Sequence, residues 1–408
     1  MMVTMSNHTL KKIITTACVL SFLGGCSRVS TMESAGSGPK EPLEIWICAD
    51  LHYLASSLHD DGTVFRQLVE QGDGKVPEYS EAIADEFIRL CMERRPDAVV
   101  IPGDLTYNGE RISLQELCGK LKALQDSGIP VLVIPGNHDL LYPYARSYFG
   151  SNARKTPAIS LADFREDCGA FGWEQAVARD SDSFSYVYPL SEDVELMFLD
   201  ANTPEAPGSI LDSTLTWAKK QLAWAQEDGK TVITVTHQSL LAQNKFMTKG
   251  FIINNHDKLE SLLRRYGVTL NLSAHIHIQH SVEEKGLTDI ATGCITVAPL
   301  RYGILNLGAD RSRWEYTPCH LEILQQEATE RFSTCMTRQI ADTLTGRDIP
   351  EEDFNYMVEF MMDLNRSYFA GEITDRDVDA VRQTEGYLKW KTYGRDTSWY
   401  QYIESILS

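Results

Sequence analysis

Residues 98–104 (AVVIPGD) and 131–139 (VLVIPGNHD) each join a short apolar run to a Pro-Gly step and then to polar side chains. Short runs rich in Val and Ile are typical of strands buried on both faces of a sheet. Comparable runs occur at residues 45–48, 196–199, 231–235 and 268–272. Helical patterns lie between them, at residues 81–93 and 114–127 among others. We therefore predict an α/β domain with layered sheets.

The C-terminal part of the chain has a different pattern. Further strands are expected at residues 291–297, 302–305 and 314–316. After about Pro318 the pattern becomes helical, with helices expected at residues 320–344, from Pro350 onward and at residues 375–391. The sequence thus predicts a main domain over residues 42–318 and a small all-α domain over residues 319–408.

Length, composition and charge limit the function. A chain of 408 residues exceeds one ordinary core, and 43% hydrophobic with 23% charged residues is typical of a globular protein. No apolar stretch reaches eighteen residues, so we expect no transmembrane helix. The 38 Lys and Arg against 57 Asp and Glu give a net charge of −19. This charge argues against a nucleic-acid polymer as partner, because the phosphate backbone would be repelled.

The first residues have the features of a secretion signal. Two Lys precede a short apolar run over residues 13–23, which is too short to span a bilayer. The sequence Leu23-Gly24-Gly25-Cys26 resembles a bacterial lipobox, in which the Cys becomes the lipidated first residue. We therefore expect a signal peptide at residues 1–25, a flexible tether at residues 26–41, and a protein anchored by lipid at Cys26 to the outer face of the cytoplasmic membrane. The alternative is an ordinary signal peptide with an incidental Cys.

Seven cysteines remain beyond residue 26. Their odd number and irregular spacing do not indicate a disulfide framework, and no CxxC pair suggests zinc. We expect most of them to be buried packing residues.

Polar side chains follow five of the predicted strands. Open α/β sheets place ligands beyond the carboxyl ends of their strands, so these positions are candidates for a site. They are Asp50 and His52, Asp104, Asn137 with His138 and Asp139, His237, and finally His275 and His277.

Imidazole and carboxylate together suit borderline divalent metals. The spacing of Asp50-x-His52 and of His275-x-His277 puts both side chains of each pair on one side of an extended segment. With Asp104, Asn137 and His237 they supply seven ligands, which suits two metal ions that share one carboxylate. Gly103 and Gly136 allow backbone conformations that other residues resist.

This ordered series, over about residues 43–310, resembles the signature of the calcineurin-like metallophosphoesterases. The resemblance implies a two-sheet β-sandwich flanked by helices. It also implies a metal ion held by Asp50, His52 and His277, a second held by Asn137, His237 and His275, and Asp104 bridging the two. The metals implied are Mn, Fe or Zn.

Residues 103–110 (GDLTYNGE) are similar to the class III cyclic-nucleotide phosphodiesterase branch, especially to lipoproteins with a C-terminal helical domain. Residues 291–293 and 302–303 also fit that branch. Two positions depart from the pattern: Ala274 replaces the usual Gly, and Gln238-Ser239 follows His237. Neither departure removes a ligand.

The reaction implied is attack of a metal-activated hydroxide on a small phosphate ester. His138 would donate a proton to the leaving oxygen, and Asp139 would orient or charge it. Asp200 could support the site or could be a turn acid. A phosphodiesterase acting on a cyclic nucleotide or related diester is the leading hypothesis. The alternatives are a phosphomonoesterase or nucleotidase on the same centre, and a non-catalytic binding lipoprotein. The sequence leaves open the substrate, the metal, the oligomeric state and the role of the helical domain.

Overall fold

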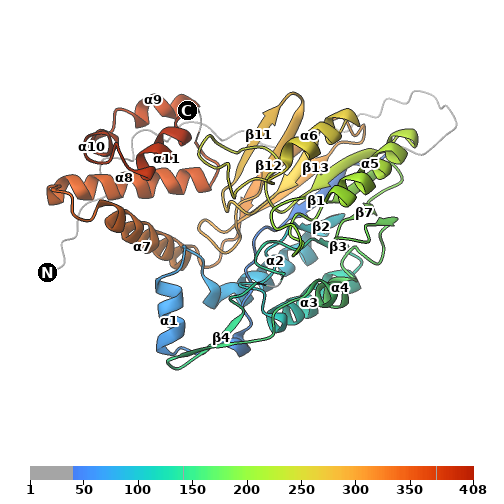
Figure 1. Ribbon diagram of the computed structural model, residues 1–408, viewed down its shortest axis with the longest axis horizontal. Coiled ribbons are helices and arrows are strands. Elements are labelled where there is room, and N and C mark those ends of the chain that lie inside the picture. Colours follow the sequence, from blue (N-terminus) through green and yellow to red (C-terminus); the bar gives the residue numbers. More distant parts are fainter. Residues whose placement is uncertain (1–39, 141, 374) are drawn as a thin grey trace, which may run out of the picture. The chain divides into compact units, whose positions relative to one another are not determined.

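The computed structural model describes residues 40–140, 142–373 and 375–408 (Figure 1). Residues 41–408 form one compact unit. The predicted signal peptide, Cys26 and most of the predicted tether lie outside the described residues.

Two large sheets and one hairpin contain the strands. The first sheet has the order β14-β13-β1-β2-β3, and the second has the order β11-β12-β10-β9-β8-β7-β6. The first is built from β1 (Leu43–Ile47), β2 (Ala98–Ile101), β3 (Val131–Val133), β13 (Arg301–Leu307) and β14 (Trp314–His320). The second is built from β6 (Ala178–Arg179), β7 (Tyr186–Pro189), β8 (Val194–Phe198), β9 (Thr231–Val235), β10 (Leu270–Ser273), β11 (His280–Glu284) and β12 (Leu287–Ala291). The hairpin joins β4 (Arg146–Phe149) and β5 (Asn152–Lys155).

Parallel pairing aligns the ends of the central strands. Strands β1, β2 and β3 are parallel, with Ile47 opposite Val100 and Val100 opposite Leu132. Strands β8, β9 and β10 are parallel in the second sheet, with Leu272 opposite Val235. The segments that follow these strands therefore leave each sheet at one edge.

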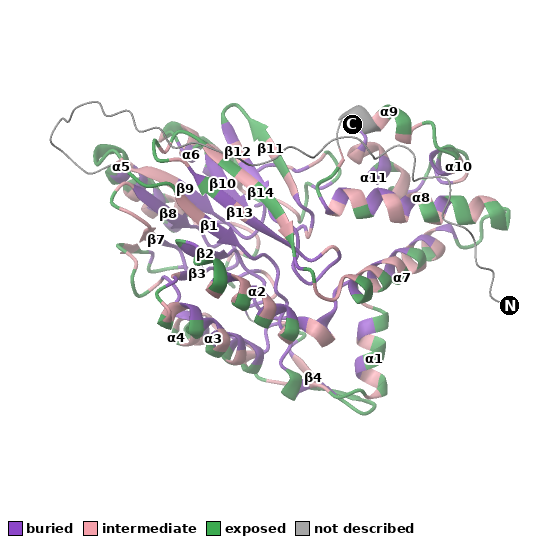
Figure 2. Cartoon of the chain, turned by 180° about the vertical axis from the view of Figure 1, so that it is seen from behind, coloured by how far each residue is buried: buried purple, intermediate pink, exposed green. Residues whose placement is uncertain are grey.

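Helices cover the sheets in layers. One core lies between the sheets, and the apolar faces of α2 (Ser80–Arg94) and α3 (Arg111–Asp126) join it. A separate cluster lies between the second sheet and α5 (Asp212–Glu227) with α6 (His256–Arg265). Figure 2 shows buried central strands, and exposed residues on the outer faces of the helices and on the edge strands β11 and β14. The shorter helices are η1 (Ser56–Leu58), α1 (Thr63–Glu70), η2 (Pro77–Tyr79) and α4 (Leu161–Cys168). The expected α/β class is confirmed.

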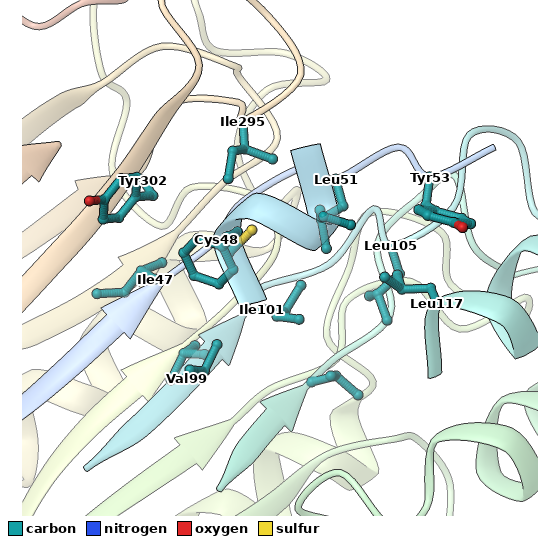
Figure 3. Close-up of a cluster of buried hydrophobic side chains, with 14 of the residues drawn as sticks. Ile47, Cys48, Leu51, Tyr53, Val99, Ile101, Leu105, Leu117, Ile295 and Tyr302 are labelled. Atoms are coloured by element: carbon teal, nitrogen blue, oxygen red, sulfur yellow. The ribbon is translucent and has the colours of Figure 1, made fainter. Parts of the chain in front are cut away.

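The core continues into the loops that leave β1 and β2. Leu51 and Leu105 follow these strands and are buried beside Ile101 (Figure 3). Each Leu lies next to candidate ligands in the sequence, Leu51 between Asp50 and His52 and Leu105 after Asp104. Apolar burial of these two side chains thus anchors the loops that carry the ligands.

The C-terminal region is helical, as expected. It contains α7 (Gln325–Leu344), α8 (Glu351–Phe369), α9 (Asp375–Val381), α10 (Glu385–Tyr393) and α11 (Ser398–Ile406). Phe332 and Met336 of α7 belong to the core between the sheets. The helices from α8 onward share a cluster with Ile276 and Ile278 of the loop after β10. The helices therefore share apolar cores with the α/β part, and the predicted boundary at residue 318 stays a prediction.

Three predicted elements differ from the structure. The predicted strand at residues 291–297 is wrong, because β12 ends at Ala291 and a loop follows. The helix expected from residue 320 begins at Gln325, because β14 continues to His320 in register with Arg301. The helix expected over residues 375–391 is two helices, because the Thr384 side chain caps α10 by accepting a hydrogen bond from the Tyr387 N–H.

The seven described cysteines are free, and all except the half-buried Cys319 are buried, in agreement with a packing role. None of the helices in the described part of the chain combines the length and hydrophobicity that crossing a membrane requires.

Candidate metal centre

The seven candidate ligands follow five strands of the two sheets. Asp50 and His52 follow β1, Asp104 follows β2 and Asn137 follows β3, all in the first sheet. In the second sheet, His237 follows β9, and His275 and His277 follow β10.

These side chains meet in two groups. The first consists of Asp50, His52, Asp104 and His277, each offering one ligand atom within 4.8 Å of the others. The second, by the same criterion, consists of Asp104, His237 and His275. Asp104 belongs to both.

The two carboxylate oxygens of Asp104 face the two groups separately. Its Oδ2 lies 3.7 Å from His52 Nε2, and its Oδ1 lies 3.4 Å from His237 Nε2. Asn137 adjoins the second group, since its Oδ1 is 2.9 Å from His237 Nε2. This arrangement brings all seven predicted ligands together, with Asp104 between the two groups.

Backbone carbonyls fix the orientation of two imidazoles in the second group. His237 Nδ1 is 2.8 Å from the Pro102 carbonyl oxygen, and His275 Nε2 is 2.9 Å from that of Gly250. An N–H on His275 Nε2 leaves its Nδ1 with a free lone pair. Against the effect of burial, the Asp104 carboxylate raises the pKa of His237 to about 9, so a metal ion at His237 Nε2 would displace a proton. The backbone N–H of His275 donates to the Asp50 carboxylate, which ties the loops of the two sheets together.

The backbone at the ligands is in an unfavourable conformation. Five of the seven ligands have positive φ angles, a region that residues other than Gly rarely adopt. They are Asp50 (53°), His52 (43°), Asp104 (49°), His275 (70°) and His277 (61°). Strained residues of this kind cluster at functional sites, where the surrounding structure enforces them.

Two glycines make room for the ligands. Gly103 has φ +102°, and a Cβ there would lie 2.5 Å from His237 Nδ1. A Cβ on Gly136 would lie 2.2 Å from Asp104 Oδ1. Gly103 therefore meets the expected need for conformational freedom. Gly136 does not have a positive φ, and glycine is needed there only because a side chain would collide with Asp104.

The buried donors fit metal ions. His52 Nδ1 is buried without a hydrogen-bond partner, and the Nε2 atoms of His52 and His277 are only 3.1 Å apart. Burial lowers the pKa of His277 to about 3 and that of His275 to about 4, so both rings are neutral at pH 7, as metal ligands must be. Burial raises the pKa of Asp50 to about 8, so a neighbouring cation would stabilise its carboxylate. Imidazole, carboxylate and amide donors suit Zn, Mn or Fe.

His138 lies at the edge of the two groups. Its Nδ1 is 2.9 Å from the Tyr107 carbonyl oxygen and 3.1 Å from Asn108 Oδ1. Its ring is edge-on to that of His52, with 4.9 Å between the ring centroids. The two oxygen acceptors hold the proton on Nδ1 and leave Nε2 for a reacting group.

Asp139 does not orient His138 as expected. Its carboxylate accepts hydrogen bonds from the N–H groups of Leu105, Thr106 and Gly136 and from the Thr106 hydroxyl, at 2.8–3.1 Å. These donors occupy both oxygens, so the side chain joins the loops after β2 and β3. The partners that orient His138 are the Tyr107 carbonyl and Asn108.

Asp200 supports the loop after β3 from a distance. Its buried carboxylate accepts from the N–H groups of Phe184 and Asn202. The Asn202 side chain in turn donates to the Pro135 carbonyl at 3.1 Å. Asp200 thus belongs to neither ligand group, and it acts through Asn202.

Two residues near the centre were not found by sequence reasoning. Cys294 forms a further potential metal-binding group with His52 and His277, although its run of residues was read as a strand. Lys75 is buried, and its charge lowers the pKa of His52 and His277 in addition to the effect of burial. No motif surrounds either residue; only the folded chain brings them to the site.

Two family models match the chain. Residues 43–279 match the family described as calcineurin-like phosphoesterase, and residues 325–408 match the C-terminal domain of cyclic nucleotide phosphodiesterase. A curated relative from Fibrobacter succinogenes, a probable cyclic nucleotide phosphodiesterase, is 25% identical over 184 residues. That match covers 45% of this chain and 57% of the relative, so it spans little more than half of the relative's length.

Solved structures are similar to the chain at low sequence identity. A dimetal phosphatase from Danio rerio has a TM-score of 0.49 and 14% identity, covering 67% of this chain and 98% of that one. The purple acid phosphatase PPD1 from yellow lupin has a TM-score of 0.44 and 14% identity, covering 69% of this chain and 52% of that one.

Proposed function

The chain belongs to the calcineurin-like phosphoesterase family, and on that premise we propose that it is a dinuclear metal-dependent phosphodiesterase acting on a cyclic nucleotide or a related small diester. The observation that carries this proposal is the position of Asp104, whose two oxygens face two separate groups of ligand atoms. One carboxylate between two groups is the arrangement that a pair of ions acting on one phosphate requires.

The ligands divide between two ions as follows. Asp50, His52 and His277 would hold one ion, Asn137, His237 and His275 would hold the other, and Asp104 would bridge them. When bound, the ions supply an activated water and neutralise charge that develops on the phosphate oxygens. Two divalent ions would also make the centre itself cationic against the carboxylates of Asp50 and Asp104, although the net charge of −19 by itself would repel an anionic substrate.

His138 is the proposed proton donor. The Tyr107 carbonyl and Asn108 Oδ1 fix its Nδ1–H, so a protonated ring can give up the proton on Nε2 to the leaving oxygen. Asp139 contributes indirectly, because it binds together the loops that carry Asp104 and His138.

The diester preference is supported by the C-terminal match. Residues 325–408 match a domain named for cyclic nucleotide phosphodiesterase, and the curated relative is named as a probable enzyme of that kind. A phosphomonoesterase could use the same ligands, so substrate preference is the property to measure.

The test compares bis-p-nitrophenyl phosphate with p-nitrophenyl phosphate, using the chelator-treated protein with and without added Mn²⁺. We expect metal-dependent turnover with the diester preferred. A clear monoester preference would contradict the diesterase proposal, and tight metal binding without turnover would support the binding lipoprotein instead. Full activity of Asn137→Ala, or full activity of His138→Ala on a diester with an alkoxide leaving group, would contradict the site assignment. A panel of 2′,3′- and 3′,5′-cyclic nucleotides and glycerophosphodiesters then identifies the substrate class.

We further propose that the mature protein is lipid-anchored at Cys26 on the outer face of the cytoplasmic membrane. The basis is the sequence Leu23-Gly24-Gly25-Cys26 after a short apolar run. Labelling of growing bacterial cells with a radioactive fatty acid should mark the wild-type protein and not a Cys26→Ala variant. Equal labelling of both would contradict the anchor.

A further inference from the structure

A polar cavity opens beside the candidate proton donor. Its volume is about 320 Å³, and nine residues line it: Gln71, Gly72, Asp73, Lys75, Tyr107, Asn108, His138, Arg338 and Gln339. Asn108 and His138, which contact each other at 3.1 Å, connect the cavity to the metal centre. A substrate held at the centre with its leaving oxygen at His138 would therefore extend into this space.

Four separate segments form the wall. The first is the loop between α1 and η2, the second is the loop after β2, the third is the loop after β3 with His138, and the fourth is helix α7. Arg338 of α7 is fixed in place, since its terminal nitrogens donate to the carbonyl oxygens of Glu70 and Gly72, both at 2.6 Å. One of these nitrogens also lies 3.8 Å from Cys335 Sγ. The guanidinium is thus held in position where α7 meets the first loop.

Lys75 supplies a second cation to the cavity. It is the only Lys among the buried residues of the described chain, and its Nζ forms an ion pair with Asp73 Oδ2 at 2.6 Å. The Asp73 carboxylate balances this charge, and the ammonium still has N–H groups that can donate to an oxygen atom in the cavity.

The lining selects the kind of group that fits. The wall presents amides from Gln71, Asn108 and Gln339 in addition to its charged groups, and Tyr107 is the only one of the nine residues with a mainly apolar side chain. Such a surface hydrogen-bonds hydroxyl and ether oxygens well and gains little from an apolar ring.

We propose that this cavity binds the hydroxylated alcohol portion of the diester, a ribosyl or glyceryl group, and that Lys75 of the first loop and Arg338 of α7 determine specificity for it; the proposal rests on the proposed phosphodiesterase function. It assigns the C-terminal helical region a place in substrate recognition. Cyclic nucleotides and glycerophosphodiesters both carry such a hydroxylated group, and the experiment tests the two classes of substrate separately.

The experiment uses the full chain with Mn²⁺ and the variants Arg338→Ala, Arg338→Lys, Lys75→Met and Gln339→Ala. The substrates are 3′,5′-cyclic AMP, 2′,3′-cyclic AMP, glycerophosphoethanolamine and bis-p-nitrophenyl phosphate. Arg331→Ala is the matched control, because Arg331 is also on α7 and also ties it to the α/β part, through Glu78 at 2.7 Å, but lines a different cavity. Metal content and the calorimetric Kd of a phosphorothioate analogue of each cyclic nucleotide are measured alongside kcat/KM.

For the hydroxylated diester that the wild type prefers, we expect Arg338→Ala and Lys75→Met to lower kcat/KM about tenfold, as loss of a charge-assisted hydrogen bond does. In Arg338→Ala, turnover of bis-p-nitrophenyl phosphate should stay within about twofold, because its aryl group makes no such bond. Arg338→Lys should restore part of the lost kcat/KM. Gln339→Ala should lower the ratio of kcat/KM for the hydroxylated diester to that for bis-p-nitrophenyl phosphate, which we call the substrate ratio. Arg331→Ala should leave this ratio unchanged. If a cyclic nucleotide is preferred, the Kd of its analogue should rise with the loss in kcat/KM.

Two results would overturn the proposal, and they differ from each other. A wild type that cleaves bis-p-nitrophenyl phosphate, with variants that keep the wild-type substrate ratio, would remove the subsite and leave the phosphodiesterase function intact. A wild type that cleaves no diester would remove both. An equal loss on all substrates in Arg338→Ala and Arg331→Ala would assign Arg338 a purely structural role. If Arg338→Ala fails to fold, Gln339→Ala gives the same readout.

Discussion

The strand-end loops and helix α7 both reach the cavity beside His138, but they differ in how their residues are specified. The loops hold buried ligands on strained backbone, with five positive φ angles among seven residues. Helix α7 is a regular helix of twenty residues whose Arg338 lies in the cavity wall. In the loops, the type of residue is set by the need for a metal ligand. On α7, Arg338 reaches the cavity because of where the helix packs. Substitutions should therefore have sharp chemical effects in the loops and graded effects on α7.

The largest effect is expected for Asp104→Asn. The amide keeps the size of the side chain but replaces one of the two oxygens that face the ligand groups. We expect kcat to fall roughly 10³-fold, because one ion of the pair is lost or misplaced. Elemental analysis should show fewer than two ions per chain. Asp126→Asn, an exposed change on α3, is the control and should match the wild type. Two ions and normal turnover in Asp104→Asn would show that Asp104 is not shared.

A smaller chemical effect is expected for His138→Ala, with metal content unchanged. For diesters with an alkoxide leaving group, kcat should fall about 10²-fold, because the proton donor is gone. The loss should be much smaller with p-nitrophenolate, which leaves readily without a proton. Rates on the two classes of substrate check this prediction, and an equal loss on both would make His138 a positioning residue.

The difference between the regions also explains what could be predicted from sequence. Asp50, His52 and the other ligands follow strands whose apolar runs are evident, so their place at the carboxyl ends of strands could be predicted. The strand predicted at residues 291–297 failed because apolar residues such as Ile295 and Val297 are buried in a loop that covers the end of β1. A buried loop and a buried strand have the same composition.

The supporting contacts were harder to predict. Asp139 follows His138 in the sequence, which suggested that the two interact. Its carboxylate instead accepts N–H groups of the loop after β2, a contact 34 residues away. Arg338 and Lys75 have no motif, because any exposed helix or loop can carry a Lys or Arg. Their role depends on packing between distant segments, which no local pattern records.

On α7, Phe332→Ala tests whether the helix is part of one cooperative structure. Phe332 is 3% exposed in the core shared with the sheets, and its ring centroid lies 5.1 Å from that of Phe369. We expect the free energy of unfolding to fall by about 3 kcal/mol in a single urea transition. Tyr356→Ala on the exposed side of α8 should change it by less than about 0.5 kcal/mol. Separate transitions for the sheets and the helices would show that α7 belongs to an independent domain.

The smallest effect is expected for Glu110→Gln, and it concerns how the free energy of unfolding depends on pH. Burial raises the pKa of Glu110 from 4.5 to about 7, and its carboxylate accepts the N–H of Asn108 at 2.9 Å. Because the folded state binds this proton more tightly than the unfolded chain, stability falls as pH rises from about 4.5 to 7 and is level above that. Glutamine removes the ionisation, so the stability of the variant relative to wild type should increase over this range, by on the order of 2 kcal/mol. Urea unfolding at pH 5 and pH 8, with the exposed Glu93→Gln as control, measures the difference. If the free energies of unfolding of wild type and Glu110→Gln change in parallel with pH, ionisation of Glu110 does not destabilise the loop after β2.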